Sequence, residues 1–424
     1  MRILFVGMPD SVHVARWCNM VAGGGFDVRL FPVYEGPVHP AFRNLTVYST
    51  QAPPPDAAAA TERGVRFVSF GRWRPPRTAL GRLLRRLRPL AADRVLFLAE
   101  VVQHARPDLV HTHELQHGGY LTLPAKRHLG EGFPPWAITN WGSDIYLFGR
   151  LDEHAPRIRE VLAACDYYCC ECVRDLALAE RFGFRGELLP VVPIGGGFDL
   201  ARCRALRAEG PTSARRTVVL KGYQGWAGRA LFGLRALALC ADALAGYRVA
   251  IYLASEDMRI AARLWSGETG VPVDLLPFMP HEEMLRLHGR ARVSIGLSIS
   301  DAISTSFLEA LVMGSFPVQS ATGCAGEWIE NGKTGFLVHP EDVDGIAAAI
   351  RRALSDGGLV DEAARQNAAT ADRRLDYATV QARVVDLYRG IERRERARGR
   401  DADNRTDAAG AAGEDAAGRR ERAP

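Results

Sequence analysis

Short apolar segments alternate with helical segments along most of the chain, and this alternation is the first constraint on its fold. In the first half, six segments are predicted to be strands: 2–7, 27–33, 65–70, 108–113, 136–142 and 166–172. The second half contains five more: 217–222, 248–254, 273–279, 293–298 and 316–320. Strands that alternate with helices form parallel sheets covered by helices. We therefore predict an α/β protein of two Rossmann-like, doubly wound parallel-sheet domains that face a central cleft.

The segment between the first two strands is the clearest helix. Ser11 can cap its N-terminus, and apolar residues recur at i, i+3, i+4 and i+7 from Val14 to Val21. Three consecutive glycines from Gly23 end the pattern. The three segments together form one βαβ unit.

A segment rich in proline, glycine and arginine separates the two halves of the pattern. Residues 188–199 contain two prolines and three consecutive glycines, and a polar stretch follows as far as Arg216. This composition is typical of an interdomain linker. The predicted organisation is an N-terminal domain (1–195), a hinge (196–215), a C-terminal domain (216–375), a closing helix (376–398) and a disordered tail (399–424), which has almost no large apolar residue.

Composition argues against several classes of protein. No apolar run reaches the roughly 18 residues that a membrane span requires, and residues 1–7 are interpreted as a strand, so we expect a cytoplasmic protein. A net charge of +5 over 424 residues is too small to indicate nucleic-acid binding. The eight cysteines indicate reduced thiols, and the cluster at 165–172 lacks the paired spacing of a zinc site.

Two glycine-containing turns argue against a nicotinamide-dependent dehydrogenase. Residues 7–11 place Met8 and Pro9 where the G-x-G-x-x-G pattern needs glycine. Residues 222–228 follow a strand but have the spacing G-x-x-G-x-x-G. A different ligand is therefore expected in the cleft.

The segment 300–318 carries the most chemistry, because a polar loop there opens a short helix after a strand. Ser306 and Glu309 fit an S-x-x-E capping box, which requires no ligand.

The same segment has a second interpretation, as an anion site. A helix that opens on Ser304, Thr305 and Ser306 at the carboxyl edge of a sheet offers free N–H groups and the positive end of its dipole to a phosphate. The carboxylates of Asp301 and Glu309 are suited to accept hydrogen bonds from sugar hydroxyls.

This segment resembles the E-x7-E region of GT-B glycosyltransferases of family 4, with Asp301 and Glu309 at the two acidic positions. The resemblance continues through Gly323, Glu327, Trp328, Asn331, Gly332 and residues 335–340, and with the two-domain layout it covers residues 1–390. It implies the GT-B fold and a retaining glycosyltransferase that moves a sugar from a UDP- or GDP-type nucleotide-diphosphate sugar to an acceptor hydroxyl. The acceptor is expected in cell-surface glycan, glycolipid or polysaccharide synthesis, and neither a cofactor nor a metal is expected.

The resemblance also implies roles for single residues. Glu309 would hold the ribose, and Asp301 with the backbone of 304–306 would hold the donor sugar and phosphate. Lys221 and Arg229 would neutralise the diphosphate, although their types are exchanged relative to the family's G-R…K-G pattern. The expected donor-binding residues are Lys221, Gly222, Arg229, Ser304, Thr305, Ser306 and Glu309.

In the first domain, residues 139–144 resemble the H-G-x-D of the same family. Asp144 keeps the acidic position and is expected to bind a substrate hydroxyl, and an Asx turn is the alternative. Trp141 replaces the histidine, so the role of that imidazole is not carried over. The residues expected on the acceptor side are Pro9, Asp10, Ser11, His13, His113 and Trp141.

A histidine-rich segment closes the fourth predicted strand. His111, His113, Glu114 and His117 form H-x-H-E-x-x-H, which suggests a metal site. Strand-end histidines are commonly hydrogen-bonded scaffold, and we favour cleft lining over metal binding.

A basic stretch runs from Arg72 to Arg94, with eight arginines and one aspartate. Leucines at 80, 83, 84 and 87 share one face of a predicted helix that Pro89 interrupts. Such a helix suits an anionic membrane surface, at the inner membrane face, or a lipid-phosphate acceptor. Packing on its own domain with a solvated basic face is an equal alternative.

Two other functions fit the same fold. A GT-B epimerase would act on a nucleotide sugar without an acceptor. A non-catalytic nucleotide-sugar binder would keep the cleft and lose turnover, and the replacement of the histidine by Trp141 keeps this alternative open.

Overall fold

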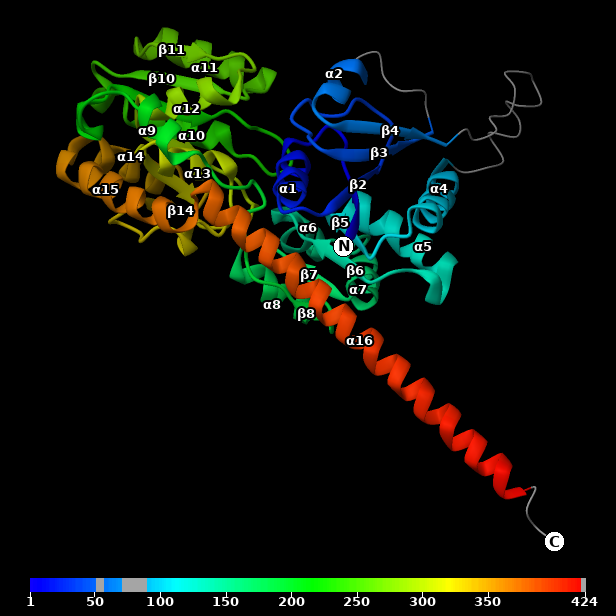
Figure 1. Cartoon of the computed structure of the whole chain (residues 1–424). Helices are drawn as coiled ribbons and strands as arrows, with labels where there is room; N and C mark the ends of the chain where they lie inside the picture. Colours follow the sequence, from blue (N-terminus) through cyan, green and yellow to red (C-terminus); the bar gives the residue numbers. More distant parts are fainter. Residues whose placement is uncertain (51–56, 71–89, 421–424) are drawn as a thin grey trace.

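The computed structural model describes residues 1–50, 57–70 and 90–420. They form two α/β domains, and a long C-terminal helix runs back from the second domain across the first (Figure 1). The predicted pair of parallel-sheet domains is thereby confirmed.

The first domain is built on a parallel sheet. Its described strands number eight, in the order β4-β3-β2-β1-β5-β6-β7-β8. Their bounds are β1 (Arg2–Gly7), β2 (Asp27–Pro32), β3 (Leu45–Ser49), β4 (Val65–Ser69), β5 (Leu109–His113), β6 (Trp136–Thr139), β7 (Tyr167–Cys169) and β8 (Glu187–Leu188). All six predicted strands are present. The prediction missed β3 and β8, and β6 ends before the predicted residue 142 because a helix begins there.

Helices cover both faces of this sheet. Successive strand residues point to opposite faces, so alternate residues of one strand pack under different helices. Ile3 and Phe5 pack in one apolar cluster, and Leu4 and Val6 in another.

The predicted cap of the first helix is confirmed, since the Ser11 hydroxyl accepts the backbone N–H of Val14 at 3.4 Å. The helices are α1 (Val12–Gly23), α2 (Ala57–Glu62), α4 (Leu90–Ala105), α5 (Tyr120–Leu129), α6 (Gly142–Tyr146), α7 (Ala155–Ala164) and α8 (Val173–Arg181), with short turns η1 (Leu115–Gly119), η2 (Gly130–Gly132) and η3 (Phe148–Arg150).

The second domain repeats this architecture with a smaller parallel sheet, in the described order β11-β10-β9-β12-β13-β14. The strands are β9 (Thr217–Lys221), β10 (Arg248–Tyr252), β11 (Val273–Leu275), β12 (Ala291–Gly296), β13 (Phe316–Ser320) and β14 (Phe336–Val338), the last of which the prediction missed. The helices are α9 (Leu200–Leu206), α10 (Ala230–Leu239), α11 (Glu256–Thr269), α12 (His281–Gly289), α13 (Thr305–Val312), α14 (Val343–Ser355) and α15 (Gly357–Arg374), with short turns η4 (Thr212–Ala214), η5 (Ala241–Leu244) and η6 (Ala325–Glu327).

The chain crosses between the domains twice, at adjacent places. The backbone N–H of Phe198 donates to the Leu375 carbonyl at 2.7 Å, and the N–H of Tyr377 donates to the Phe198 carbonyl at 3.0 Å. The predicted hinge over 196–215 differs from the structure, because α9 and η4 pack on the second domain and Leu206 shares an apolar cluster with Leu285. The segment between the domains is therefore shorter than predicted.

Helix α16 (Tyr377–Arg420) closes the first domain. The Tyr388 hydroxyl accepts the indole N–H of Trp17 at 2.7 Å and lies 2.6 Å from Nδ1 of His111. Helix α16 continues as far as Arg420, through most of the segment predicted to be a disordered tail, and the disorder of that segment stays a prediction. Alanine, arginine and glutamate favour helix, and the segment has no proline before Pro424.

No helix in the described part of the chain is both long and apolar enough to span a membrane. The predicted amphipathic helix over 80–88 lies outside the described residues. Arg94, the last arginine of that basic stretch, lies in α4, with its Nη1 2.6 Å from Oε1 of Glu35.

Candidate functional site

A cleft of about 570 Å³ lies where the two domains meet, a size that suits a small-molecule ligand. It lies at the carboxyl ends of both sheets, which is the usual ligand position in doubly wound folds. From the first domain it is lined by His13, Arg16, His39, Trp141, Gly142 and Glu171, among others. From the second domain it is lined by Lys221, Phe278, His281, Asp301, Ser304, Thr305, Ser306 and Glu309, among others.

Helix α13 begins at this cleft, beside the end of β9. Ser304 is its N-cap residue. The ammonium of Lys221 donates to the Ser304 hydroxyl at 3.2 Å, and the hydroxyls of Ser304 and Ser306 are 2.8 Å apart. A cation and a helix N-terminus at one place form an anion site. The sequence correctly predicted that these residues lie together.

The capping-box interpretation of Glu309 is wrong. The helix begins at Thr305, so Glu309 lies in its second turn, and its carboxylate accepts Nε2–H of His281 at 3.0 Å. On the other side, Nε2 of His288 lies 3.9 Å from Oε2. Burial lowers the pKa of His288 to about 4, so that ring is neutral at pH 7. The Glu309 carboxylate is thus held at the cleft by one hydrogen bond.

Asp301 lines the cleft and also a smaller adjoining cavity of about 180 Å³. Burial raises the pKa of Asp301 above its ordinary value, and the positive charge of Lys221 counteracts that rise. The structure therefore places this carboxyl beside the predicted phosphate site.

Arg229 is directed away from the site. Its Nε lies 2.6 Å from Oε1 of Glu341, and its Nη1 donates to the Gly228 carbonyl at 2.9 Å. Among the described residues, Arg16 on α1 is the arginine that lines the cleft. The sequence prediction missed it. Its Nη1 donates to the Gly195 carbonyl at 3.3 Å.

Gly222 serves packing. A Cβ at this position would lie 2.9 Å from the Cα of Ala254 and 3.0 Å from the Tyr252 carbonyl oxygen, so the glycine permits the close approach of two loops. It is absent from the described lining of the cleft.

Asp144 is a backbone cap. Its Oδ2 accepts the N–H groups of Leu115 and Trp141, each at 2.9 Å, and only 6% of the residue is exposed. Burial and the charge of Glu114 raise the pKa of Asp144 well above its ordinary value. These bonds differ from the Asx-turn alternative, in which the carboxylate would accept the N–H of the residue two positions later. The binding of a substrate hydroxyl by Asp144 stays a prediction.

Two of the predicted acceptor-side residues line the cleft. The rings of His13 and Trp141 meet edge to face, with centroids 5.8 Å apart. Burial and the charge of Arg16 lower the pKa of His13 to about 4, so its ring is neutral at pH 7.

The other four predicted acceptor-side residues do not belong to the described lining. The Pro9 carbonyl accepts the N–H of His39 at 2.8 Å, and the Asp10 carboxylate accepts the Tyr34 hydroxyl at 2.5 Å. Ser11 caps α1, and His113 is fully buried. Pro9, Asp10 and Ser11 therefore have local partners, whereas no described residue bonds to the buried ring nitrogens of His113.

The histidine-rich segment does not converge on one point. His111 bonds to Tyr388 and lies 2.7 Å from the Thr139 hydroxyl through Nε2. Glu114 accepts the backbone N–H of His117 at 2.7 Å and thereby caps η1. These contacts are structural.

Glu171 lines the cleft and was missed by the prediction, because its C-C-E-C context was interpreted as an apolar strand. Its two oxygens accept the N–H groups of Ile194 and Ile303, each at 3.3 Å, so it touches both domains. Burial and the charge of Asp301 raise the pKa of Glu171 to about 8.

One group of potential metal donors is found among the described residues. The ligand atoms of Cys172, Cys324 and Glu327 lie within 4.8 Å of one another. Two thiolates and a carboxylate are a donor set that zinc accepts. Here, however, the Glu327 carboxylate already accepts the N–H of Val173 at 2.9 Å.

Family models match part of each domain. A family model described as "Glycosyl transferases group 1" matches residues 255–372, which include Asp301 and Glu309. A model described as "Glycosyl transferase 4-like" matches residues 78–172 of the first domain.

Two curated relatives, both glycogen synthases of Mycobacterium tuberculosis (strains CDC 1551 / Oshkosh and ATCC 25618 / H37Rv), are 33% identical over 118 residues. The match spans 28% of this chain and only 28% of each relative's length.

Solved structures share the fold over nearly the whole chain. Anabaena HepE in complex with UDP-glucose has a TM-score of 0.64 at 16% identity and covers 92% of this chain and 100% of that chain. Sucrose-phosphate synthase from Thermosynechococcus elongatus has a TM-score of 0.64 at 17% identity and covers 92% and 99%. The trehalose 6-phosphate synthase of Burkholderia multivorans has a TM-score of 0.64 at 12% identity and covers 94% and 98%.

Proposed function

We propose that this chain, a group 1 glycosyltransferase with the GT-B fold, transfers a sugar from a nucleoside-diphosphate sugar to an acceptor hydroxyl with retention at the anomeric carbon. The observation that carries the proposal is the convergence of Lys221, the N-terminus of α13 and the Glu309 carboxylate in one interdomain cleft. A cation beside a helix N-terminus suits a diphosphate, and a carboxylate nearby suits ribose hydroxyls.

The residues then take the following roles. Glu309, held by His281, accepts hydrogen bonds from the ribose. Lys221 and the first N–H groups of α13 bind the diphosphate and stabilise the charge that grows on it as it departs. Asp301 contacts the donor sugar. Arg16 supplies a second positive charge from the opposite domain, the role that the sequence had suggested for Arg229.

The reaction exchanges one bond for another at the anomeric carbon. The bond from that carbon to the phosphate oxygen breaks, and a bond to the acceptor oxygen forms on the same face. The acceptor proton passes to the departing diphosphate. Because Lys221 and backbone N–H groups offset the negative charge, the proposal includes no metal ion, and transfer should persist in EDTA.

One matched solved structure favours a uridine donor, because it is named with bound UDP-glucose. For this chain the base and the sugar are proposals, and UDP-glucose is the first donor to test, with GDP-sugars as the alternative.

The test has two steps. Thermal unfolding with UDP, GDP and their sugar conjugates identifies the donor, because a ligand that binds only the folded state raises Tm. Nucleotide release and NMR of the product with glycan and lipid-linked acceptors then follow transfer and the anomeric configuration. An isomerised donor without transfer would indicate an epimerase. Donor binding with no turnover of any kind would indicate a binding protein.

The acceptor is proposed to be a glycan or a lipid-linked glycan. The basic stretch from Arg72 to Arg94 is the sequence feature that supports a lipid-linked acceptor at an anionic membrane surface. Co-sedimentation with vesicles of anionic lipid, compared with neutral vesicles, tests this part of the proposal. Equal binding to anionic and neutral vesicles would contradict this part of the proposal.

A further inference from the structure

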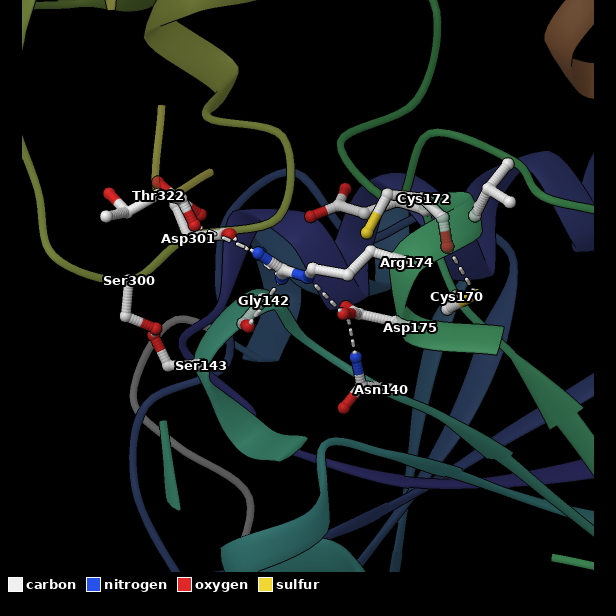
Figure 2. Close-up of polar contacts among 12 residues, drawn as sticks. Asn140, Gly142, Ser143, Cys170, Cys172, Arg174, Asp175, Ser300, Asp301 and Thr322 are labelled. Atoms are coloured by element: carbon white, nitrogen blue, oxygen red, sulfur yellow. Dashed lines mark hydrogen bonds and ion pairs between the residues drawn. The ribbon is translucent and has the colours of Figure 1, made fainter. Parts of the chain in front are cut away.

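Loops of the two domains touch beside the cleft, and Arg174 lies at the centre of this contact (Figure 2). Arg174 is in the first turn of α8, in the first domain. Its guanidinium donates to two carbonyls of the second domain, from Nη1 to Thr322 and from Nη2 to Asp301, each at 3.0 Å. Nη2 also lies 3.4 Å from the Gly142 carbonyl of its own domain. One side chain thus joins the loops of both domains.

Contacts within the first domain hold this guanidinium in position. Asp175 is fully buried, and its Oδ1 accepts Nε–H of Arg174 at 2.8 Å (Figure 2). Nδ2 of Asn140 donates to the other Asp175 oxygen at 2.8 Å. On another side, the ring of Tyr146 lies 3.9 Å from the guanidinium carbon. The charge is therefore paired and oriented before it reaches the second domain.

Glu327 makes the reciprocal contact from the second domain. Its two carboxylate oxygens lie 2.9 and 3.1 Å from the backbone nitrogen of Val173. One of them also accepts the N–H of Arg174 at 3.4 Å. These N–H groups belong to the N-terminus of α8, where a negative charge is favourable. Each domain therefore places one charged side chain on backbone groups of the other.

The approach of the two domains at this place is close. A Cβ on Gly142 would lie 2.8 Å from the carbonyl carbon of Asp301 and would overlap the backbone nitrogen of Ala302. Alongside, the Ser300 hydroxyl donates to the Ser143 hydroxyl at 2.9 Å. A residue larger than glycine at 142 would hold the domains apart.

We propose that Arg174 and Glu327 form a latch that closes the cleft, and that Arg174, through the Asp301 carbonyl, positions the loop that carries the Asp301 carboxyl. The interdomain bonds of these two residues exist only when the domains are together, so they favour the closed arrangement. Both are positioning residues. The latch is independent of the proposed transfer reaction, and only its effect on catalysis rests on that function.

A distance measurement tests the latch without any substrate. All eight cysteines are buried, so spin labels attach selectively to cysteines introduced at two exposed sites, Glu131→Cys and Glu268→Cys. Double electron–electron resonance then measures the distance between the two labels, and thereby the separation of the domains. Arg174→Gln and Glu327→Ala should each raise the ratio of open to closed protein about tenfold. Arg185→Gln is the matched control, because the carbonyls to which Arg185 donates, those of Glu180 and Phe184, belong to its own domain.

Two further variants complete the test. Gly142→Ala should produce the longer distance by steric exclusion and calibrates the open state. Arg174→Lys keeps the charge but cannot reach both carbonyls with two nitrogens, so it should open the cleft partially. It replaces Arg174→Gln if that variant does not fold. The latch is refuted if the Arg174 and Glu327 variants keep the distance distribution of the unaltered protein.

Kinetics test the positioning role. In Arg174→Gln, kcat should fall about tenfold or more while KM for the donor changes less, and Arg174→Lys should recover part of the loss. An unchanged kcat would refute the positioning of Asp301. If the unaltered protein transfers no sugar, the proposed function fails, and the distance measurement still decides the latch.

Discussion

The imidazole of His281 and the carboxylate of Glu309 are joined by a hydrogen bond of 3.0 Å between Nε2 and Oε1. His281 is the first residue of α12, and Glu309 lies in α13. The bond fixes the carboxylate at the wall of the cleft. A carboxylate so oriented can accept hydrogen bonds from a diol without paying further ordering entropy.

Glu309→Gln tests whether this carboxylate binds the ribose. The amide keeps the size of the side chain but loses the charge, so the affinity for UDP should fall about tenfold to a hundredfold. Isothermal titration calorimetry gives the comparison. Glu341→Gln is the control, since Glu341 is more exposed and pairs with Arg229. An unchanged Kd in Glu309→Gln would contradict the assignment.

Lys221→Ala and Arg229→Ala should differ strongly. Lys221 reaches the N-terminus of α13, so its loss should lower kcat about a hundredfold to a thousandfold. Arg229 pairs with Glu341, and its loss should lower kcat less than tenfold. Steady-state rates of nucleotide release measure both. Equal losses would mean that Arg229 leaves Glu341 and joins the site when the donor is bound.

The fold could be predicted because the alternation of strands and helices is a local pattern. Three strands were missed: β3, β8 and β14. Their length alone does not explain this, because β3 has five residues, as do the predicted β4 and β5, and β14 has three, as do the predicted β7 and β11. The predicted disordered tail overlaps the end of α16, and it stays a prediction. Low apolar content argues against packing, but it does not prevent a helix from continuing.

The grouping of Lys221, Asp301 and Glu309 could be predicted from local patterns in one domain. Lys221 ends β9, Asp301 lies in the loop that follows β12, and Glu309 lies on α13, the helix that this loop opens. Arg16 and Glu171 could not be found in this way. Whether they face the second domain depends on how the two domains pack, which no local pattern encodes. The direction in which a side chain points also depends on partners from other parts of the chain.

Arg229 and Asp144 show this second point. Their positions in the chain fit the family pattern, but Glu341 and two backbone N–H groups, respectively, determine where their side chains point. In each case one partner is distant in sequence: Glu341 for Arg229 and Leu115 for Asp144.

Trp141→Phe tests what the tryptophan supplies in place of the family's histidine. The indole lines the cleft, and no described residue accepts its buried N–H. If this N–H bonds to substrate, the phenyl ring should lower kcat/KM about threefold to tenfold. Trp141→Ala, which also removes the contact with His13, should cost more. Equal activity of Trp141→Phe and the unaltered protein would leave the indole a packing role only.

The pH dependence of stability should reveal Glu171. Burial and the charge of Asp301 raise the pKa of Glu171 from 4.5 to about 8 in the folded protein. Between these two values the folded state keeps a proton that the unfolded chain has lost. The free energy of unfolding contributed by this group therefore falls as pH rises from about 4.5 to about 8. Above that range, the folded protein holds a buried carboxylate at its full cost.

Glu171→Gln removes this titration while keeping the shape of the side chain. The variant should therefore gain stability relative to the unaltered protein as pH rises, reaching about 1 to 3 kcal/mol at pH 9. Thermal unfolding at pH 5.5, 7 and 9 measures the trend. Glu160→Gln, at an exposed carboxylate that pairs with Arg127, is the control. If the stability difference between Glu171→Gln and the unaltered protein is the same at all three pH values, Glu171 does not hold a proton in the closed cleft.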